Sequence, residues 1–162
     1  MKRIILHWTA GKYKPNSCDL EHYHFLVDDE GRVHNGKFDV SANENCSDGH
    51  YAMHTGGGNT GSIGVAMCGM LGYKNFSNVG KYPIKPVQFE RTMKLCAELL
   101  KEFDLQLSEK TLMTHFEFGF NHPNTSSFGK IDITFVPPYP HIRGDEVGNF
   151  IRSKVRWYLE NL

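Results

Sequence analysis

Apolar residues in the chain occur in short runs that predict buried strands. Ile4, Ile5 and Leu6 form one run without polar alternation, and residues 62–70 (SIGVAMCGM) form a longer one. Continuous runs of this kind are typical of strands that are covered on both faces. Residues 111–114 (TLMT) make a third, shorter strand that leads directly into His115.

A hairpin is predicted at residues 22–33 (HYHFLVDDEGRV), because two apolar segments flank an Asp-Glu-Gly turn. Asn16 or Ser17 would cap a short helix before it, and residues 51–55 (YAMHT) predict a further short strand. The glycine cluster at residues 56–61 lacks the Lys-Ser/Thr that follows a phosphate-binding loop. We interpret it as the rim of a cleft, where the backbone approaches a ligand closely.

Two later segments follow the helical period. Pro86 is suited to the first position of a helix. The apolar residues of this helix recur at steps of four and three and are Phe89, Met93, Cys96, Leu100 and Phe103. Residues 145–162 predict a second helix whose apolar side holds Phe150, Val155, Tyr158 and Leu159. The pattern predicts a single-domain α/β protein of 162 residues, with a central mixed β-sheet flanked by helices.

Charge and cysteine usage narrow the function classes. Lys plus Arg and Asp plus Glu number 18 each, so the net charge is zero, which argues against a nucleic-acid partner. No apolar run approaches a membrane span, and the N-terminus leads into a strand rather than a signal peptide. We therefore expect the protein to be made in the cytoplasm. We also expect it to be a monomer. The four cysteines lack C-x-x-C spacing and are expected as free thiols, although a disulfide between Cys18 and Cys46 remains an alternative.

Candidate metal chemistry centres on residues 111–135. His115 follows the strand, and Asp132 comes after a polar loop of Asn, Pro, Thr, Ser and Gly. Imidazole and carboxylate are good zinc ligands, and a catalytic zinc uses three protein ligands and leaves one position open. His7, at the end of the first strand, is the candidate third ligand, and its alternative is a buried histidine with satisfied nitrogens. The His22-x-His24 pair is a weaker candidate because no third ligand lies near it in sequence.

Four segments in order carry a family resemblance. They are residues 4–11 (IILHWTAG), 23–31 (YHFLVDDEG), 52–65 (AMHTGGGNTGSIGV) and 114–132, which begins THFE and ends KID. Together they resemble the type 2 zinc-dependent N-acetylmuramoyl-L-alanine amidases. This family includes amidase-type phage endolysins and peptidoglycan recognition proteins.

The resemblance implies a role for each matching residue. The implied zinc ligands are His7, His115 and Asp132. Tyr23 and Lys130 match the two polar catalytic positions. The implied substrate-binding residues are Trp8, Thr9, His54, Thr55 and Asn59.

The sequence also departs from the family pattern. Some branches of the family carry a glutamate in the strand after Ser-Ile-Gly, where this chain has Val-Ala-Met at residues 65–67. No glutamate is therefore available there as a general base, and Tyr23 becomes the stronger candidate for proton transfer. The usual Pro-Gly after the ligand aspartate is replaced by Ile133 and Thr134, which predicts a different local loop.

The implied chemistry is consistent with amide hydrolysis. A zinc held by two imidazoles and a carboxylate lowers the pKa of its water toward ~7. In an extended segment Lys130 would point to the same side as Asp132, where it would stabilise an oxyanion. The Tyr23 hydroxyl would help to move a proton to the leaving amine. Alone, Lys130 would be read as a surface lysine and Tyr23 as a half-buried core aromatic.

Three functions remain open from the sequence. The first is a peptidoglycan hydrolase that cleaves the amide between N-acetylmuramic acid and L-alanine, in a phage or prophage endolysin or in recycling of wall fragments in the cytoplasm. The second is a recognition module that binds muropeptide without cutting it. The third is a zinc amidase or peptidase that acts on a soluble peptide without a glycan.

Overall fold

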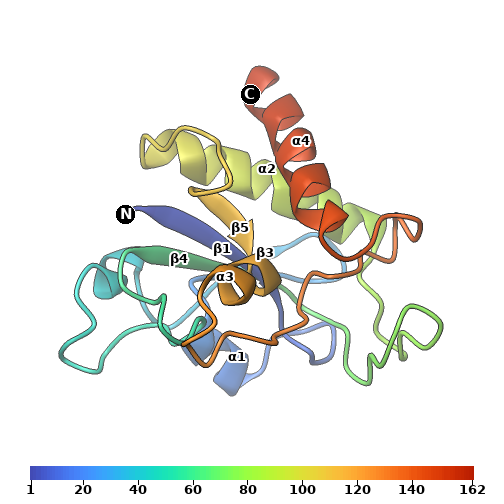
Figure 1. Cartoon of the computed structure of the whole chain (residues 1–162), viewed down its shortest axis with the longest axis horizontal. Coiled ribbons are helices and arrows are strands. Elements are labelled where there is room, and N and C mark those ends of the chain that lie inside the picture. The colour runs from blue at the N-terminus through green and yellow to red at the C-terminus, as the bar shows by residue number, and fades with distance from the viewer.

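A five-stranded mixed sheet forms the centre of the computed structural model, which describes residues 1–162 (Figure 1). The strands are β1 (Arg3–Trp8), β2 (Phe25–Val27), β3 (Val33–Asn35), β4 (Ser62–Met67) and β5 (Leu112–Thr114), in the spatial order β3-β2-β4-β1-β5. β1 runs parallel to both β4 and β5, β2 runs parallel to β4, and β3 pairs antiparallel with β2. The predicted α/β class with a mixed sheet is confirmed.

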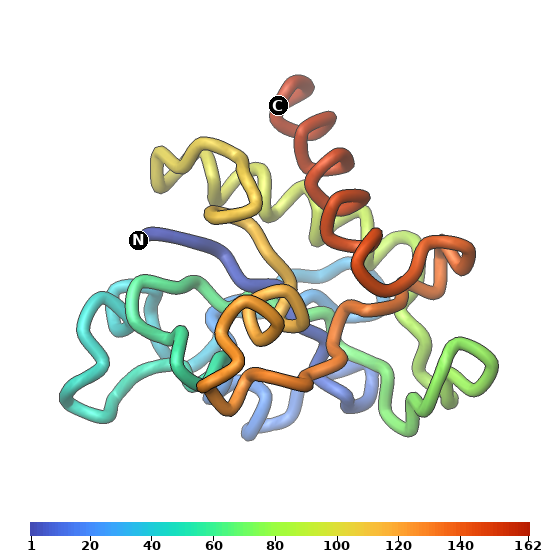
Figure 2. The backbone as a smooth tube through the Cα atoms, viewed as in Figure 1, coloured from blue at the N-terminus to red at the C-terminus, as the bar shows by residue number.

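Helices cover the sheet. They are α1 (Ser17–His22), α2 (Pro86–Glu102), α3 (His115–Asn121) and α4 (Glu146–Glu160), with a 3₁₀ helix η1 (Val40–Asn43). Figure 1 shows α2 and α4 together on one side of the sheet, with α1 on the other side and α3 beside β5. The tube in Figure 2 shows the segment after α3, in orange, running past that helix before it reaches α4. None of the helices has the length and apolar character that a membrane span requires.

The alternation of β1 separates a large core from the candidate site. Ile4 and Leu6 belong to the main core, which they share with Phe89 of α2 and Val147 of α4. Ile5 faces the opposite side and packs with Met113 and Phe118. Because side chains alternate along a strand, His7 lies on the same side as Ile5. β1 thus presents His7 on the face that α3 covers.

Several expected boundaries are confirmed. Asn16 caps α1 through its side chain, which accepts from the Asp19 backbone N–H. Pro86 is the first residue of α2, and the last helix lies within the predicted range. All four cysteines are free thiols.

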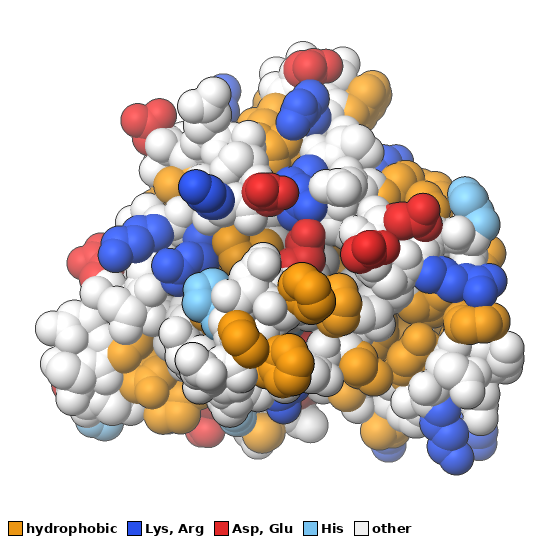
Figure 3. Space-filling view, viewed as in Figure 1, with side chains coloured by type: hydrophobic (Ala, Val, Ile, Leu, Met, Phe, Trp, Pro, Cys, Tyr) orange, Lys and Arg blue, Asp and Glu red, His pale blue; other side chains and the backbone are white.

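Lys, Arg, Asp and Glu side chains are interspersed on the face of the molecule that is shown in Figure 3.

Two strand predictions need correction. The predicted strand at residues 51–55 is wrong, because the amide of buried Asn43 takes over the pairing of this segment. That amide accepts from the Ala52 N–H and donates to the Ala52 carbonyl at 3.0 and 2.9 Å. The hairpin begins later than expected, since His22 ends α1 and β2 starts at Phe25.

The polar loop expected directly after His115 is instead the short helix α3. The Thr114 side chain accepts from the Glu117 backbone N–H at 3.1 Å, and the Glu117 carboxylate accepts from the Thr114 N–H at 3.0 Å. This reciprocal capping box starts a helix at the residue after the strand. His115 is therefore held by a strand end and a helix start at once. The longer run at residues 62–70 also ends earlier as a strand, at Met67.

Candidate metal centre and cleft

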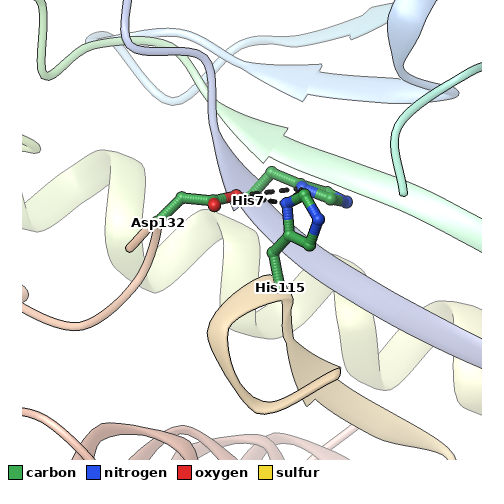
Figure 4. Close-up of side chains that lie close together, drawn as sticks. All are labelled: His7, His115 and Asp132. Atoms are coloured by element: carbon green, nitrogen blue, oxygen red, sulfur yellow. Dashed lines mark hydrogen bonds and ion pairs between the residues drawn. The ribbon is translucent and has the colours of Figure 1, made fainter. Parts of the chain in front are cut away.

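Three side chains from distant parts of the sequence point toward one another (Figure 4). The Nδ1 atoms of His7 and His115 lie 3.1 Å apart. The Asp132 Oδ2 lies 3.0 Å from the first and 3.1 Å from the second. The structure thus brings together the three residues that the sequence predicts as metal ligands.

Each side chain is held by a different local structure. His7 is carried by β1, between the parallel strands β4 and β5. His115 is the first residue of α3. Asp132 lies in a turn whose next residue, Ile133, has a φ of 66° and is 1% exposed. A left-handed conformation is unfavourable for a β-branched residue, so we attribute this turn to the burial of the Ile133 side chain.

The outer nitrogens of both imidazoles have their own partners. The Ser127 hydroxyl donates to the Gly56 carbonyl at 2.7 Å, so its oxygen is free to accept from His115 Nε2–H at 3.0 Å. His7 Nε2 lies 3.2 Å from His54 Nδ1 and 3.3 Å from the Thr55 hydroxyl. With hydrogens on the outer nitrogens, both Nδ1 atoms present lone pairs to the centre.

Burial controls the charges in the centre. Burial lowers the pKa of His7 to about 4, although the Asp132 carboxylate opposes this shift, so the imidazole is neutral at pH 7. Burial alone would raise the pKa of Asp132, but its close contacts with the His115 and His7 rings outweigh burial and hold that pKa below its usual range. At pH 7 the centre thus combines the neutral His7 imidazole with the Asp132 carboxylate.

This donor set fits a zinc ion. Three lone-pair donors within 3.1 Å of one another repel each other unless a cation or shared protons lie between them. Ligands at ~2.0–2.1 Å in a tetrahedral site are separated by about 3.3 Å, close to the observed distances. The three residues also satisfy the requirement for three protein ligands with a fourth position left open.

The centre lies at a cleft of about 620 Å³. Among the predicted site residues, the cleft is lined by His115, Asp132, Tyr23, Lys130, Trp8, Thr9, His54 and Asn59. Thr55 does not line it: its side chain is fully buried, so the expected substrate contact does not fit its placement. Burial, and then the charge of Asp132, raises the pKa of Tyr23, so this hydroxyl stays protonated. The Tyr23 and His7 ring centroids lie 5.2 Å apart.

Comparison with known proteins agrees with this geometry. The family model described as N-acetylmuramoyl-L-alanine amidase matches residues 1–130. The chain belongs to this amidase family. The match ends at Lys130, so the Asp132 ligand position lies just beyond it. No curated protein sequence matches the chain.

Solved structures share the fold of this amidase family member at low sequence identity. One is the amidase AmiD from E. coli in complex with anhydro-N-acetylmuramic acid-L-Ala-D-gamma-Glu-L-Lys, with 16% identity, a TM-score of 0.54, and coverage of 82% of this chain and 52% of that chain. Another is the ectodomain complex of peptidoglycan recognition proteins LCa and LCx bound to tracheal cytotoxin, with 18% identity, a TM-score of 0.52, and coverage of 94% and 81%. A weaker similarity is to the Ph2119 endolysin of a Thermus scotoductus bacteriophage, with 19% identity, a TM-score of 0.47, and coverage of 72% and 71%.

The sequence pattern did not reveal every residue of the site. Ser127 contacts His115, yet it lies in a polar loop where nothing distinguishes it from Ser126. The sequence offers His24 as part of a weak metal pair, but its ring is buried, with Nε2 2.9 Å from Asn43 Oδ1 and Nδ1 accepting from the Gly64 N–H at 2.9 Å. Its two nitrogens are thus occupied by the fold.

Proposed function

We propose that the chain is a zinc-dependent N-acetylmuramoyl-L-alanine amidase that hydrolyses the amide between N-acetylmuramic acid and L-alanine of peptidoglycan. The observation that carries the proposal is the convergence of His7, His115 and Asp132 within 3.1 Å at a cleft lined by Tyr23 and Lys130. Family membership supports the same reaction class.

The proposed zinc would be held by the two Nδ1 atoms and the Asp132 carboxylate. When bound, it would supply a nucleophile from water at neutral pH and polarise the scissile carbonyl. The chain supplies the remaining functions. Burial excludes water from the two imidazoles, which would strengthen their electrostatic interactions with a bound cation.

Tyr23 and Lys130 are proposed as the catalytic side chains. The protonated Tyr23 hydroxyl lines the cleft beside His7 and would donate toward the reacting oxygen and help the leaving amine gain its proton. The Lys130 side chain is exposed at the same cleft, and its ammonium would stabilise the oxyanion formed at the carbonyl. Trp8, Thr9 and Asn59 are proposed to contact the substrate from the cleft wall.

The test is release of new L-alanine amino termini from purified peptidoglycan, with zinc quantified in the same preparations. We expect the wild-type protein to release these termini and to carry about one zinc per chain, because its ligand set is complete. Asp132→Ala should lose both properties, because it removes the only charged ligand. Asp48→Ala, which changes an exposed aspartate that does not line the cleft, should retain both.

A recognition module is the alternative function. It is favoured by the shared fold of the peptidoglycan recognition proteins LCa and LCx, whose ectodomain complex binds tracheal cytotoxin. A protein that binds muropeptide, carries no zinc and releases no amine would establish this alternative and remove the roles of Tyr23 and Lys130. Release of amines from peptides that lack a muramyl group would favour a general zinc peptidase instead.

The domain and its biological setting are also proposals. We propose that residues 1–162 form one amidase domain, because Asp132 and α4 lie beyond the residues that the family model matches yet belong to the site and the main core. Rapid solubilisation of intact walls would support an endolysin, whereas activity confined to soluble muropeptides would support recycling of wall fragments.

A further inference from the structure

His54 contacts His7 of the candidate centre and has both ring nitrogens engaged by the protein. It is 6% exposed. Its Nε2 lies 3.3 Å from the Ser62 carbonyl oxygen, which only accepts hydrogen bonds, so Nε2 carries the hydrogen. The neutral ring then presents Nδ1 as an acceptor, 3.2 Å from His7 Nε2. No ring nitrogen is left over to bind a substrate.

Thr55 offers a second acceptor to the same hydrogen of His7. Its hydroxyl oxygen lies 2.7 Å from His54 Nδ1, to which it is placed to donate, and 3.3 Å from His7 Nε2, from which it is placed to accept. The Thr55 side chain is fully buried, so water does not compete for these contacts. The His7 Nε2–H therefore faces the Thr55 hydroxyl oxygen and the single lone pair of His54 Nδ1, which it shares with the Thr55 hydroxyl hydrogen.

The surrounding chain is shaped to hold His54 in this place. A Cβ at Gly64 of β4 would lie 2.5 Å from two atoms of the His54 ring, so only glycine leaves room for it. The Thr55 N–H donates to the Asn59 side-chain oxygen at 2.8 Å, which fixes the backbone next to His54. These contacts explain why the segment keeps its position without belonging to a strand.

The tautomer of His7 decides whether it can bind a metal. Asp132 Oδ2 lies 3.0 Å from His7 Nδ1, and a carboxylate so close favours a hydrogen on that nitrogen. An Nδ1–H imidazole has no lone pair to offer at the centre. Acceptors at Nε2 oppose this by favouring the other tautomer. We propose that His54, together with Thr55, is a positioning residue that holds His7 with its hydrogen on Nε2 and its Nδ1 free for zinc.

This inference rests on the proposed zinc site, and the experiment measures zinc affinity directly. Zinc dissociation constants would be determined by competition with a chromophoric chelator for wild type, His54→Phe and His54→Gln. Phe keeps the ring but has no acceptor, and we expect roughly 10–100-fold weaker zinc binding, the usual effect of losing such an outer partner. In Gln, the amide oxygen accepts from His7 while the NH₂ group donates to the Ser62 carbonyl, so most of the affinity should return.

Two further measurements separate positioning from other roles. Thermal unfolding in a metal chelator checks that each variant folds. If His54→Phe does not fold, Thr55→Val replaces it, because valine is nearly equal to threonine in shape. Thr55→Val should also weaken zinc binding. With saturating zinc, KM for muropeptide should match that of wild type. A raised KM with unchanged zinc affinity would overturn the inference in favour of substrate contact.

The possible failures are distinguishable. If wild type binds no zinc, both the proposed function and this inference are wrong. If wild type binds zinc and His54→Phe binds it equally tightly, only the positioning role is wrong. Equal loss in His54→Phe and His54→Gln would also overturn it, because a hydrogen-bonding role requires recovery by the variant that keeps the acceptor.

Discussion

At the metal centre, the partner of each outer nitrogen decides what each inner nitrogen can do. Ser127 accepts from His115, and the pair of His54 and Thr55 accepts from His7. Such outer contacts orient metal ligands and raise their basicity. The proposed zinc site therefore depends on residues that would not touch the ion themselves.

Lys130 provides the residue-scale prediction. Replacing it with methionine keeps the aliphatic stem but removes the ammonium, so oxyanion stabilisation should be lost while zinc content is retained. We expect kcat to fall about 10²–10³-fold, the usual effect of removing one such group. Initial rates of amine release with zinc quantified would measure this. Lys81→Met, at an exposed position away from the cleft, should match wild type. Equal rates for the two variants would show that Lys130 is an ordinary surface lysine without a catalytic role.

At the level of single residues, much of the site could be predicted from the sequence. His7 follows a continuous apolar run, and His115 follows a second one, so both were expected at strand ends. Ser127 and the buried role of Thr55 could not be predicted, because hydrogen-bond partners depend on which loops meet in space. Gly56, whose carbonyl accepts from Ser127, is 71 positions away from it in sequence.

At the level of elements, α4 holds α3, the helix that begins at His115, in place through hydrogen bonds. Arg152 of α4 donates to both carboxylate oxygens of Glu117, at 3.0 and 2.8 Å, and to the Leu112 carbonyl at 2.9 Å. Glu117 also completes the capping box of α3 by accepting from the Thr114 backbone N–H. A residue beyond the family match thus connects the last helix to β5 and to the helix that begins with the candidate ligand His115.

Arg152→Met tests this connection. The substitution leaves the largely buried Glu117 carboxylate without its cation and the Leu112 carbonyl without one donor. We expect the free energy of unfolding to fall by about 3 kcal/mol, the usual effect of breaking a buried ion pair from one side. Urea unfolding in a metal chelator would measure it without a contribution from bound metal. Arg156→Met, at an exposed position of the same helix, should change stability by less than about 0.5 kcal/mol. Similar losses in both variants would contradict the role of the pair.

Element prediction succeeded where the pattern was long and failed where a side chain took over backbone pairing. The periodic face beginning at Pro86 predicted α2 closely. The segment at residues 51–55 has the composition of a strand, but the distant side chain of Asn43 satisfies its backbone. α3 could have been found, since Thr114 and Glu117 form a capping-box pattern next to His115.

At the level of the whole molecule, the parallel sheet brings the ligands together. β1 lies between β4 and β5, so the carboxyl ends of β1 and β5 are neighbours, and His7 and His115 follow from that adjacency. The strand order is not written in any local pattern, because it depends on which runs pair across long connections. The sequence therefore predicted the class of the fold and the three residues that meet at the candidate centre, but not the order of strands.

The pH dependence of stability is a property of this same buried framework. Burial lowers the pKa of His24 to about 4, from 6.5 for an unperturbed histidine. Its Nδ1 accepts from the Gly64 N–H, so a second hydrogen on the ring would face a donor. The unfolded chain therefore binds the proton first as pH falls.

The stability contributed by neutral His24 should be fully present above about pH 6.5 and lost as pH falls toward 4. The loss should reach roughly 3 kcal/mol. Urea unfolding at intervals from pH 7 to 4, in a metal chelator, would measure it. His24→Gln keeps an acceptor and a donor without titrating and should flatten this slope, although other buried histidines leave a remainder. His50→Gln changes an exposed histidine and should keep the wild-type slope. If His24→Gln loses stability as steeply as wild type, protonation of His24 does not drive the acid transition.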